Sequence, residues 1–277
     1  MTALISLVTD STSDVPPDLV QRFNIRVVPS LVVIDGRPYQ DGVEMTRETF
    51  YQRLATFDPL PTTATPASGE FEAAYRSCPE GPIVSIHTAA TLSGLFNAAR
   101  VGAESLGERV TVIDSGSLSL GVGWQLIAAG EAIEAGASLP DVLKAIDAIR
   151  RRLKVFALLD TLENLRRSGR MSLLKASIAG ALQIKPIIEL AEGSITAVAQ
   201  NRTIKKAMTD FIARVRALGR LERLAVMYTD DPVLADEARE ALADQCSSPP
   251  LMAQAAPTIG THIGPGAVAV AVVKYEA

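Results

Sequence analysis

The chain has 277 residues, of which 48% are hydrophobic and 21% charged, and its formal net charge is −4. This composition is typical of a folded globular protein with one large or two medium domains, and it excludes a disordered or low-complexity chain. No apolar run approaches the roughly 18 residues of a membrane-spanning helix, and the first residues lack the basic start of a secretory signal. We therefore expect a cytoplasmic protein.

The first half of the chain alternates apolar, β-branched runs with helical patterns. We expect strands at 3–9, 25–34, 82–87 and 109–113. We expect helices starting at Asp14 and the prolines after it, and at 68–77, 93–106, 119–135 and 139–153. This βαβ order is typical of a parallel sheet with helices on both faces.

From residue 154 the pattern changes to strand runs separated by hairpins as well as helices. The expected strands are 154–159, 187–190, 194–200, 223–229 and 267–275, with helices at 203–218 and 232–244. We therefore predict an α/β protein of two domains. Residues 1–152 are expected to form a parallel-sheet α/β/α domain, and 153–277 an α+β domain with a mixed, partly antiparallel sheet.

Clusters of polar residues follow three of the predicted strands of the first half, at 9–14, 87–94 and 114–119. Because the carboxyl ends of parallel strands meet at one edge of a sheet, we expect a binding site there. Ser93 opens a predicted helix, so its hydroxyl and the backbone N–H groups from Gly94 onward suit a carboxylate or phosphate. Taken singly, each such residue is more often a turn former or a helix cap.

Two loops carry further candidate groups. The segment PTTATP at 61–66 is stiffened by its prolines, and the glycine-rich segment 259–266 contains His262, one of only two histidines. A lone histidine is more often structural than a ligand, but glycines permit close backbone approach. Both interpretations of His262 stay open on these residues alone.

Eight segments, taken in order, resemble the DegV family of bacterial fatty-acid-binding proteins. They are VTDSTSD at 8–14, PTTATP at 61–66 followed by GEF, LSG at 92–94, VIDS at 112–115, LENL to SGRMS at 162–172, IKPI at 184–187, RTIKKA at 202–207 and GTHIGPG at 260–266. The resemblance implies two α/β domains with one acyl chain buried in a slot at their interface.

The resemblance also implies a site and a role. Thr63 and Ser93, with Gly94 beside them and His262 close by, match the residues that hold the carboxylate of a long-chain fatty acid such as palmitate, stearate or oleate. The family is a carrier, so no catalytic residue, cofactor or metal is expected. The sequence departs from the family near this group at Ala64, Ala89, Ala90 and Leu95, where polar residues are usual.

A partner is implied as well: a separate fatty-acid kinase that phosphorylates the bound carboxylate, with Arg170 and Arg202 matching the docking arginines. Residues 151–216 hold 13 Lys and Arg against 5 Asp and Glu, a local net charge of +8. This excess suits an acidic partner or transient contact with an anionic membrane surface. The stretch has few aromatic residues, which disfavours single-stranded nucleic acid. Nothing in the sequence demands more than a monomer.

Two other functions have partial support in the sequence. A serine-dependent lipid or ester hydrolase would use Ser93, His262 or His87, and Asp114, but the G-x-S-x-G motif of many such enzymes is absent. A nucleotide-binding enzyme would need more than Gly121-Val122-Gly123, which lacks the third glycine of the dinucleotide fingerprint. The carrier is therefore the favoured prediction, with the hydrolase as the alternative.

Overall fold

The first sheet of the protein is parallel, as the βαβ order predicts. The computed structural model describes residues 4–174 and 184–276. Strands β1 (Ser6–Asp10), β2 (Arg26–Val28), β6 (Ile83–His87) and β7 (Val110–Asp114) pair in the order β2-β1-β6-β7, all parallel. The polar residues after β1, β6 and β7 therefore lie at one edge of this sheet.

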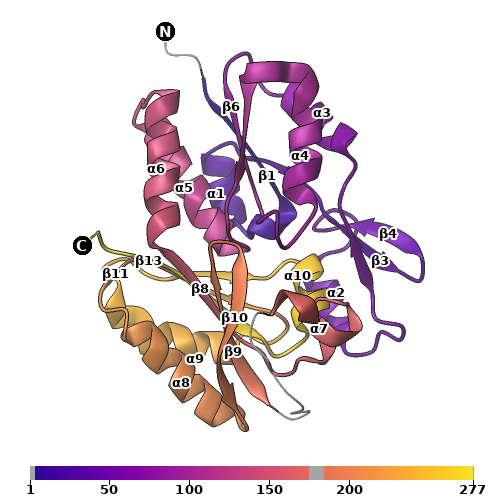
Figure 1. Cartoon of the computed structure of the whole chain (residues 1–277), viewed down its shortest axis with the longest axis vertical. Helices are drawn as coiled ribbons and strands as arrows, with labels where there is room; N and C mark the ends of the chain where they lie inside the picture. The colour runs from indigo at the N-terminus through magenta and orange to yellow at the C-terminus, as the bar shows by residue number, and fades with distance from the viewer. Residues whose placement is uncertain (1–3, 175–183, 277) are drawn as a thin grey trace.

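Helices cover both faces of the parallel sheet. They are α1 (Pro17–Arg22), α3 (Ser68–Arg76), α4 (Leu95–Ala103), α5 (Leu120–Glu134) and α6 (Leu139–Arg152). Because side chains alternate along a strand, Val8 of β1 packs with α3 and α4, whereas its neighbour Leu7 packs with α5 on the opposite face. Figure 1 shows α3 and α4 on one side of β1 and β6, and α5 and α6 on the other.

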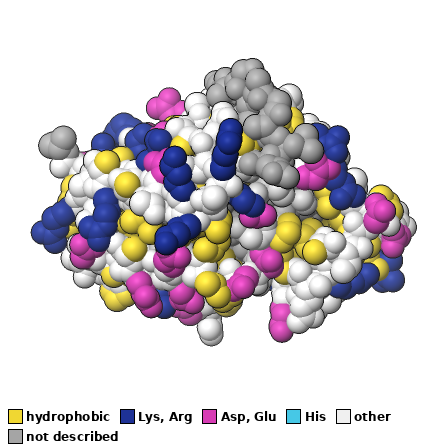
Figure 2. Space-filling view, turned by 90° about the horizontal axis from the view of Figure 1, so that it is seen from below, with side chains coloured by type: hydrophobic (Ala, Val, Ile, Leu, Met, Phe, Trp, Pro, Cys, Tyr) yellow, Lys and Arg dark blue, Asp and Glu magenta, His cyan; other side chains and the backbone are white. Residues whose placement is uncertain are grey.

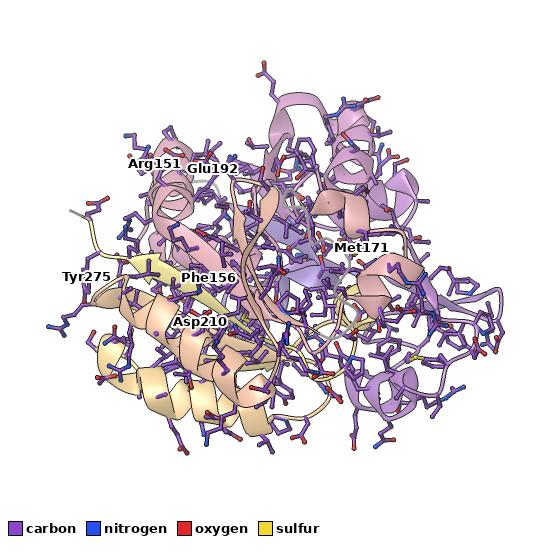
Figure 3. All side chains as sticks on the ribbon, turned by 60° about the horizontal axis from the view of Figure 1, so that its bottom comes forward. Arg151, Phe156, Met171, Glu192, Asp210 and Tyr275 are labelled. Carbon is purple, nitrogen blue, oxygen red and sulfur yellow. The ribbon has the colours of Figure 1, made fainter. Side chains whose placement is uncertain are left out.

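A second sheet of six strands follows, with the order β10-β9-β8-β13-β11-β12. Its members are β8 (Leu153–Leu158), β9 (Lys185–Ala191), β10 (Ser194–Asn201), β11 (Leu221–Tyr228), β12 (Leu251–Gln254) and β13 (Val268–Lys274). Among the described strand pairs of this sheet, only β11–β12 is parallel. Helices α8 (Ile204–Arg216) and α9 (Val233–Leu242) cover one face, where Phe156 lies in the same core cluster as Phe211 (Figure 3). The mixed sheet confirms the predicted fold class.

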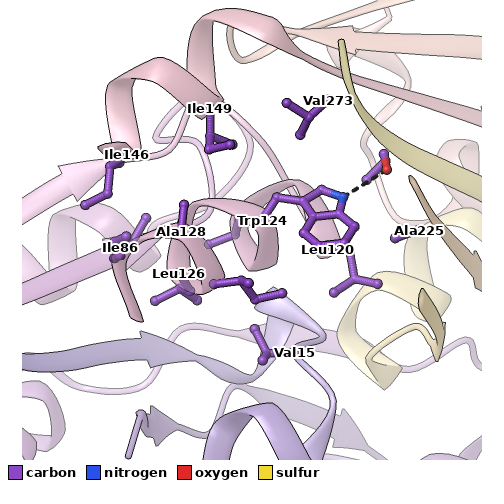
Figure 4. Packing of buried hydrophobic residues seen from close by; sticks show 14 of the residues in the cluster. Val15, Ile86, Leu120, Trp124, Leu126, Ala128, Ile146, Ile149, Ala225 and Val273 are labelled. Atoms are coloured by element: carbon purple, nitrogen blue, oxygen red, sulfur yellow. Dashed lines mark hydrogen bonds between the residues drawn. The ribbon is translucent and has the colours of Figure 1, made fainter. Parts of the chain in front are cut away.

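One continuous core joins the two sheets. Side chains of α5 and α6 pack on the parallel sheet and also on the second sheet, where Val155, Ala271 and Val273 belong to the same cluster. The Trp124 indole N–H donates a hydrogen bond of 3.0 Å to the Ala271 carbonyl across this core (Figure 4). The α5–α6 pair is therefore a shared layer between the sheets.

A small third sheet was not expected. The predicted strand 25–34 is wrong as one element, because it divides into β2 and β3 (Leu31–Ile34), which belong to different sheets. Pro29, between them, has no backbone N–H to donate to a sheet. Strand β3 pairs with β4 (Arg37–Gln40) and β5 (Thr62–Ala64), and α2 (Arg47–Leu54) packs against them.

Two further local predictions are corrected. The segment 259–266 is not a loop throughout, because α10 (Pro257–Ile263) occupies its first part and the chain turns at Gly264, where φ is 80°. Asp14 does not cap α1, whose first turn has no side-chain cap. The remaining elements are α7 (Glu163–Arg167) and the 3₁₀ turns at Ser11–Ser13, Glu104–Arg109, Met171–Leu173 and Ala243–Gln245. In the part of the chain described, no helix has the length and apolarity needed to cross a membrane.

Candidate functional site: a polar cavity joined to an apolar one

Two cavities adjoin each other between the carboxyl edge of the parallel sheet and the second sheet. Their volumes are about 160 Å³ and 90 Å³. Arg170 lines both, together with six apolar side chains: Leu118, Leu165, Leu173, Ile195, Ile259 and Ile263. These shared walls make the two cavities neighbouring parts of one slot with different linings.

The larger cavity is the polar part of the slot. It is lined by Thr63 and Thr65 from β5 and the loop after it, by Ser93 and Gly94 at the start of α4, and by His262 of α10. Its other hydroxyl groups belong to Thr12, Ser30, Thr88 and Thr258. All four residues predicted to hold a carboxylate therefore line one cavity, although they come from three separate segments of the chain.

Thr63 and His262 are directly bonded to each other. The Thr63 hydroxyl lies 3.0 Å from His262 Nε2, and the other ring nitrogen, Nδ1, is buried without a partner among the described residues. Burial lowers the pKa of His262 to about 4, with the positive charge of Arg170 acting in the same direction. The imidazole is therefore neutral at pH 7, and the pair has one polar hydrogen left for a ligand.

Ser93 and Gly94 form the part of the wall beside the proline-flanked loop. The Ser93 hydroxyl oxygen accepts a long hydrogen bond of 3.4 Å from the Leu95 N–H, so its own hydrogen is available. Gly94 precedes α4, and a Cβ at this position would lie 3.0 Å from the Thr65 hydroxyl oxygen. The absence of a side chain thus lets the start of α4 approach the proline-flanked loop closely.

A buried hydrogen-bond chain leads away from the polar cavity. Thr12 Oγ1 lies 2.8 Å from Thr88 Oγ1 and donates to Asp10 Oδ1, which also accepts the Thr12 N–H. Asp10 Oδ2 lies 2.8 Å from His87 Nδ1, and His87 Nε2 lies 2.7 Å from Ser85 Oγ. This chain fixes the side of the cavity formed by β1 and β6.

The residues of the alternative hydrolase are not assembled. Ser93 has no hydrogen bond to either histidine, since His262 is bonded to Thr63 and His87 to Asp10 and Ser85. Asp114 accepts a hydrogen bond of 2.9 Å from the Gly116 N–H, which stabilises the turn after β7. Asp10, His87 and Ser85 do form a Ser-His-Asp sequence, but Ser85 is fully buried and lines neither cavity.

The smaller cavity is almost wholly apolar. Strands of the second sheet supply most of its walls, including Val155 and Ala157 of β8, Ile188 of β9, Met227 of β11 and Ala269 of β13. These side chains belong to core clusters other than the one that contains α8 and α9, and they lie on the opposite face of the sheet. Ser119, Arg170, Tyr228 and Thr229 also line this cavity, but its surface is nearly all hydrocarbon and suits an acyl chain.

A buried charge cluster positions α10, which carries His262. Asp14 Oδ1 lies 2.8 Å from Arg47 Nη1 and accepts the Ala256 N–H at 2.9 Å, just before the helix. The Tyr51 hydroxyl donates to the Ala255 carbonyl at 2.9 Å. Burial raises the pKa of Asp14, while the charge of Arg47 and the hydrogen bonds from Ser119 and Ala256 oppose the rise. The cluster therefore ties α2 and the segment after β1 to the helix of the site.

The two predicted docking arginines differ in position. Arg170 is half-buried, lines both cavities and donates a hydrogen bond of 2.7 Å to the Ser168 carbonyl. Arg202 is exposed just before α8, where Lys205 and Lys206 are exposed too. Arg202, Lys205 and Lys206 have no acidic partner among the described residues.

Most other cations of the basic stretch are paired. The pairs are Arg151–Asp147, Arg152–Glu222, Lys154–Glu189, Arg166–Glu163, Arg167–Asp58, Lys185–Asp160, Arg214–Asp210 and Arg216–Asp244. Figure 2 accordingly shows basic and acidic side chains interspersed over the face it presents. The described cations of this stretch that have no acidic partner are therefore Arg170 and those at the start of α8.

Two hydroxyl residues of the cavity were missed in the sequence. Ser30 was hidden inside a predicted strand, and Thr258 preceded the glycine-rich segment. The Pro29-Ser30 step, which interrupts the apolar run, is a signal that could have identified Ser30. Of the positions that depart from the family, Ala64 and Leu95 line the polar cavity, whereas Ala89 and Ala90 do not. No group of three or more His, Cys, Asp or Glu able to hold a metal occurs among the described residues.

Known proteins with the same organisation were found by sequence and by structure. DegV domain-containing proteins of Mycobacterium tuberculosis and Deinococcus radiodurans are 36% and 33% identical, the first covering 97% of this chain and 96% of its own length, the second 99% of both. A DegV family protein from Thermus thermophilus, solved for its fatty acid binding, superposes with a TM-score of 0.87 at 33% identity, covering 98% and 99% of the two chains. DegV from Bacillus subtilis, described as a fatty acid binding protein, gives 0.87 at 27% identity, with 99% and 100% covered.

A family model described as uncharacterised protein, DegV family, matches residues 4–275, which is nearly the whole chain. The matched span includes both sheets, all four predicted carboxylate residues and both cavities. The chain therefore belongs to the DegV family.

Proposed function

We propose that this protein binds one long-chain fatty acid and acts as a monomeric carrier. The carboxylate lies in the polar cavity, held by the hydroxyl groups of Thr63 and Ser93, the backbone N–H of Gly94 and the Thr63–His262 pair. The acyl chain enters the apolar cavity. The single observation that carries the proposal is the joining of a hydroxyl-lined cavity to an almost wholly apolar one through shared walls.

The energetics favour such a ligand. Burying an acyl chain contributes about 0.8 kcal/mol per CH₂, so a chain of about sixteen carbons gains on the order of 10 kcal/mol before the costs of association. The carboxylate then needs hydrogen bonds only to offset its desolvation, and two or three from hydroxyl and N–H groups are sufficient. The similarity to the Thermus and Bacillus proteins supports the same ligand class here.

We further propose that the bound fatty acid is presented to a separate kinase that converts the carboxylate to an acyl phosphate. Arg202, Lys205 and Lys206 supply exposed, unpaired positive charge for an acidic partner or for transient membrane contact. Arg170 lines both cavities, and in this proposal it also takes part in docking. In this proposal the chain divides into domains at 1–152 and 153–277, with the slot between them.

A titration tests the headgroup assignment. We expect delipidated protein to bind palmitate, and Thr63→Val and Ser93→Ala each to weaken the affinity by about tenfold or more, since a hydrogen bond to a charged group is worth about 1.5–3 kcal/mol. Hexadecanol, which has no carboxylate, should lose less in both variants. The matched control is Thr209→Val, because Thr209 is exposed on α8 and bonds only the Lys205 carbonyl. Unchanged palmitate affinity in both site variants would overturn the assignment.

A further inference from the structure

The apolar cavity follows one row of side chains across the second sheet. Strand pairing places Ala157 opposite both Ile188 and Ala269, and it places Ala269 opposite Met227. Because directly opposite residues of paired strands point to the same face of a sheet, these four side chains form a row over β9, β8, β13 and β11. All four line the apolar cavity, so the cavity runs across the strands.

The row is open at one end and closed at the other. Beyond Ile188, the side chain of Ile195 on the edge strand β10 lines both cavities, so the row joins the polar cavity there. Beyond Met227, its partner Ala253 of β12 lines neither cavity. An acyl chain held by its carboxylate in the polar cavity would therefore enter the row over β10 and end over β11.

Larger side chains close the side of the row that faces α5. Val155 lies opposite Leu190 in the next row of the same face, and both residues line the cavity. A Cβ at Gly121 of α5 would lie 3.0 Å from Val155 Cγ2, so the helix packs directly on this valine. The helix and these two side chains therefore form one side wall of the cavity.

The chain that follows β11 and β12 closes the other side. Thr229 and Ala255 line the cavity there, and the Ala255 N–H donates to the Tyr228 carbonyl at 2.7 Å. The Thr229 hydroxyl donates to Asp230 Oδ1 and accepts the Ala267 N–H, each at 3.0 Å. This hydroxyl has no hydrogen left for a ligand, so the surroundings suit a methyl end better than a polar one.

Met227 lies at the closed end with a long, unbranched side chain that is only 2% exposed. The reach of this side chain therefore decides how many carbons fit between the carboxylate and the end of the row. We infer that Met227 sets the longest acyl chain that this protein accepts, by meeting the terminal methyl group. The inference rests on the proposed function and adds a chain-length limit to it.

Two substitutions move the closed end in opposite directions. Met227→Ala removes the side chain beyond Cβ and leaves space for about three more chain carbons. Ala269→Met places the same side chain one strand nearer to the entry, a step of about 4.8 Å. An extended chain of single bonds advances roughly 1.2 Å per bond, so this step removes space for about four carbons.

A competition among chain lengths tests the inference. The delipidated full chain is incubated with an equimolar mixture of the even-numbered saturated acids from laurate to behenate, and native mass spectrometry identifies the acids that are bound. The matched control is Met208→Ala, because Met208 is also 2% exposed but lies in the core on the opposite face of the sheet and lines neither cavity. Thermal unfolding verifies that each variant is folded.

In the wild type, relative occupancy should rise about fourfold with each added CH₂ up to one length and fall beyond it. The preferred acid should be longer in Met227→Ala, shorter in Ala269→Met and unchanged in Met208→Ala. A preferred acid that stays the same in folded Met227→Ala or Ala269→Met, or that shifts equally in Met208→Ala, would overturn the inference. Should one of the two site variants not fold, the other decides. A wild type that binds no acid of the series would instead contradict the proposed function.

Discussion

Replacing Asp41 by Asn should stabilise the protein at pH 8 far more than at pH 4. Asp41 is buried after β4, accepts a hydrogen bond of 2.9 Å from the Ser11 hydroxyl with one oxygen, and has no partner for the other among the described residues. Burial raises its pKa from 3.8 to about 7, although the charge of Arg47 opposes the shift. The folded state therefore binds the Asp41 proton more tightly than the unfolded chain does.

The direction and the size of the pH dependence of stability follow from this difference in proton affinity. A raised carboxyl pKa contributes stability that is fully present below about pH 4 and is lost as the pH rises through 7. At about 1.4 kcal/mol for each pKa unit, the loss is on the order of 4 kcal/mol. An asparagine keeps an oxygen for Ser11 but does not ionise, so the stability difference between variant and wild type should grow by this order between pH 4 and pH 8.

Urea unfolding of both proteins at each pH from 4 to 8 measures that difference directly, and all other titrating groups cancel in it. Asp35→Asn is the matched control, because Asp35 is exposed in the turn between β3 and β4 and has a φ of 51° that asparagine tolerates. A difference that is independent of pH, or one that shrinks as the pH rises, would refute the reasoning.

Three other predictions concern the site. Without ligand, the wild type should lose stability as the pH falls from about 6.5 to about 4, because a His262 pKa lowered to about 4 disfavours protonation in the folded state by roughly 3 kcal/mol. His262→Gln should remove this loss, and urea unfolding of both proteins at pH 5 and pH 7 measures it. Ala269→Phe should fill the apolar cavity and weaken palmitate binding by tenfold or more, with a smaller effect on a medium-chain acid, as read by calorimetry. Arg202→Glu should reduce acyl phosphate formation by the partner kinase while palmitate affinity stays unchanged, as read by product formation at fixed kinase concentration.

Each of these has its own control and contrary result. If the difference in unfolding free energy between the wild type and His262→Gln is the same at pH 5 and pH 7, the imidazole is not buried and neutral as the account requires. Equal losses for long and medium chains in Ala269→Phe would mean that the acyl chain does not reach β13. For docking, Arg220→Glu makes the same charge change at another exposed arginine, near the start of β11. An equal loss of acyl phosphate formation in both arginine variants would indicate a general electrostatic effect and not a docking site at Arg202.

The parts of the fold that the sequence predicts are those in which one periodicity runs uninterrupted. Residues 120–134 and 139–152 keep a helical pattern between clear ends, Glu134 being followed closely by Gly136 and Leu139 being preceded by the capping Ser138. The run at 268–274 is apolar throughout because β13 is a central strand covered on both faces. In such segments the local pattern and the tertiary packing agree.

The predictions failed where tertiary contacts override the local pattern. The run 25–34 is apolar in both of its strands, and only Pro29 indicates that the chain leaves one sheet for another. The glycines at 260–266 indicated a loop, yet Gly260 lies within α10. This position needs glycine for a tertiary reason, because Tyr51 occupies the space that a Cβ would need. Asp14 reads as a helix cap in the sequence, but Arg47, more than thirty residues away, draws it into an ion pair.

The candidate site was predicted in part for the same reason. Ser93 and Gly94 follow from the rule that ligands bind at the carboxyl edge of a parallel sheet, and β1, β6 and β7 do form that edge. Thr63 and His262 come from outside that sheet, and only the family resemblance brought them to the same cavity. No local pattern connects residues that are 199 positions apart, as these two are.

The central claim is tested most directly by native mass spectrometry of the protein as purified, followed by denaturation and analysis of the released lipid. Our account predicts a mass increase equal to one fatty acid per chain, with a single long-chain acid, or a narrow mixture, released on unfolding. A protein that is empty as purified and that also fails to take up palmitate or oleate would contradict the account, and Ser93 would then be the first residue to probe for hydrolase activity.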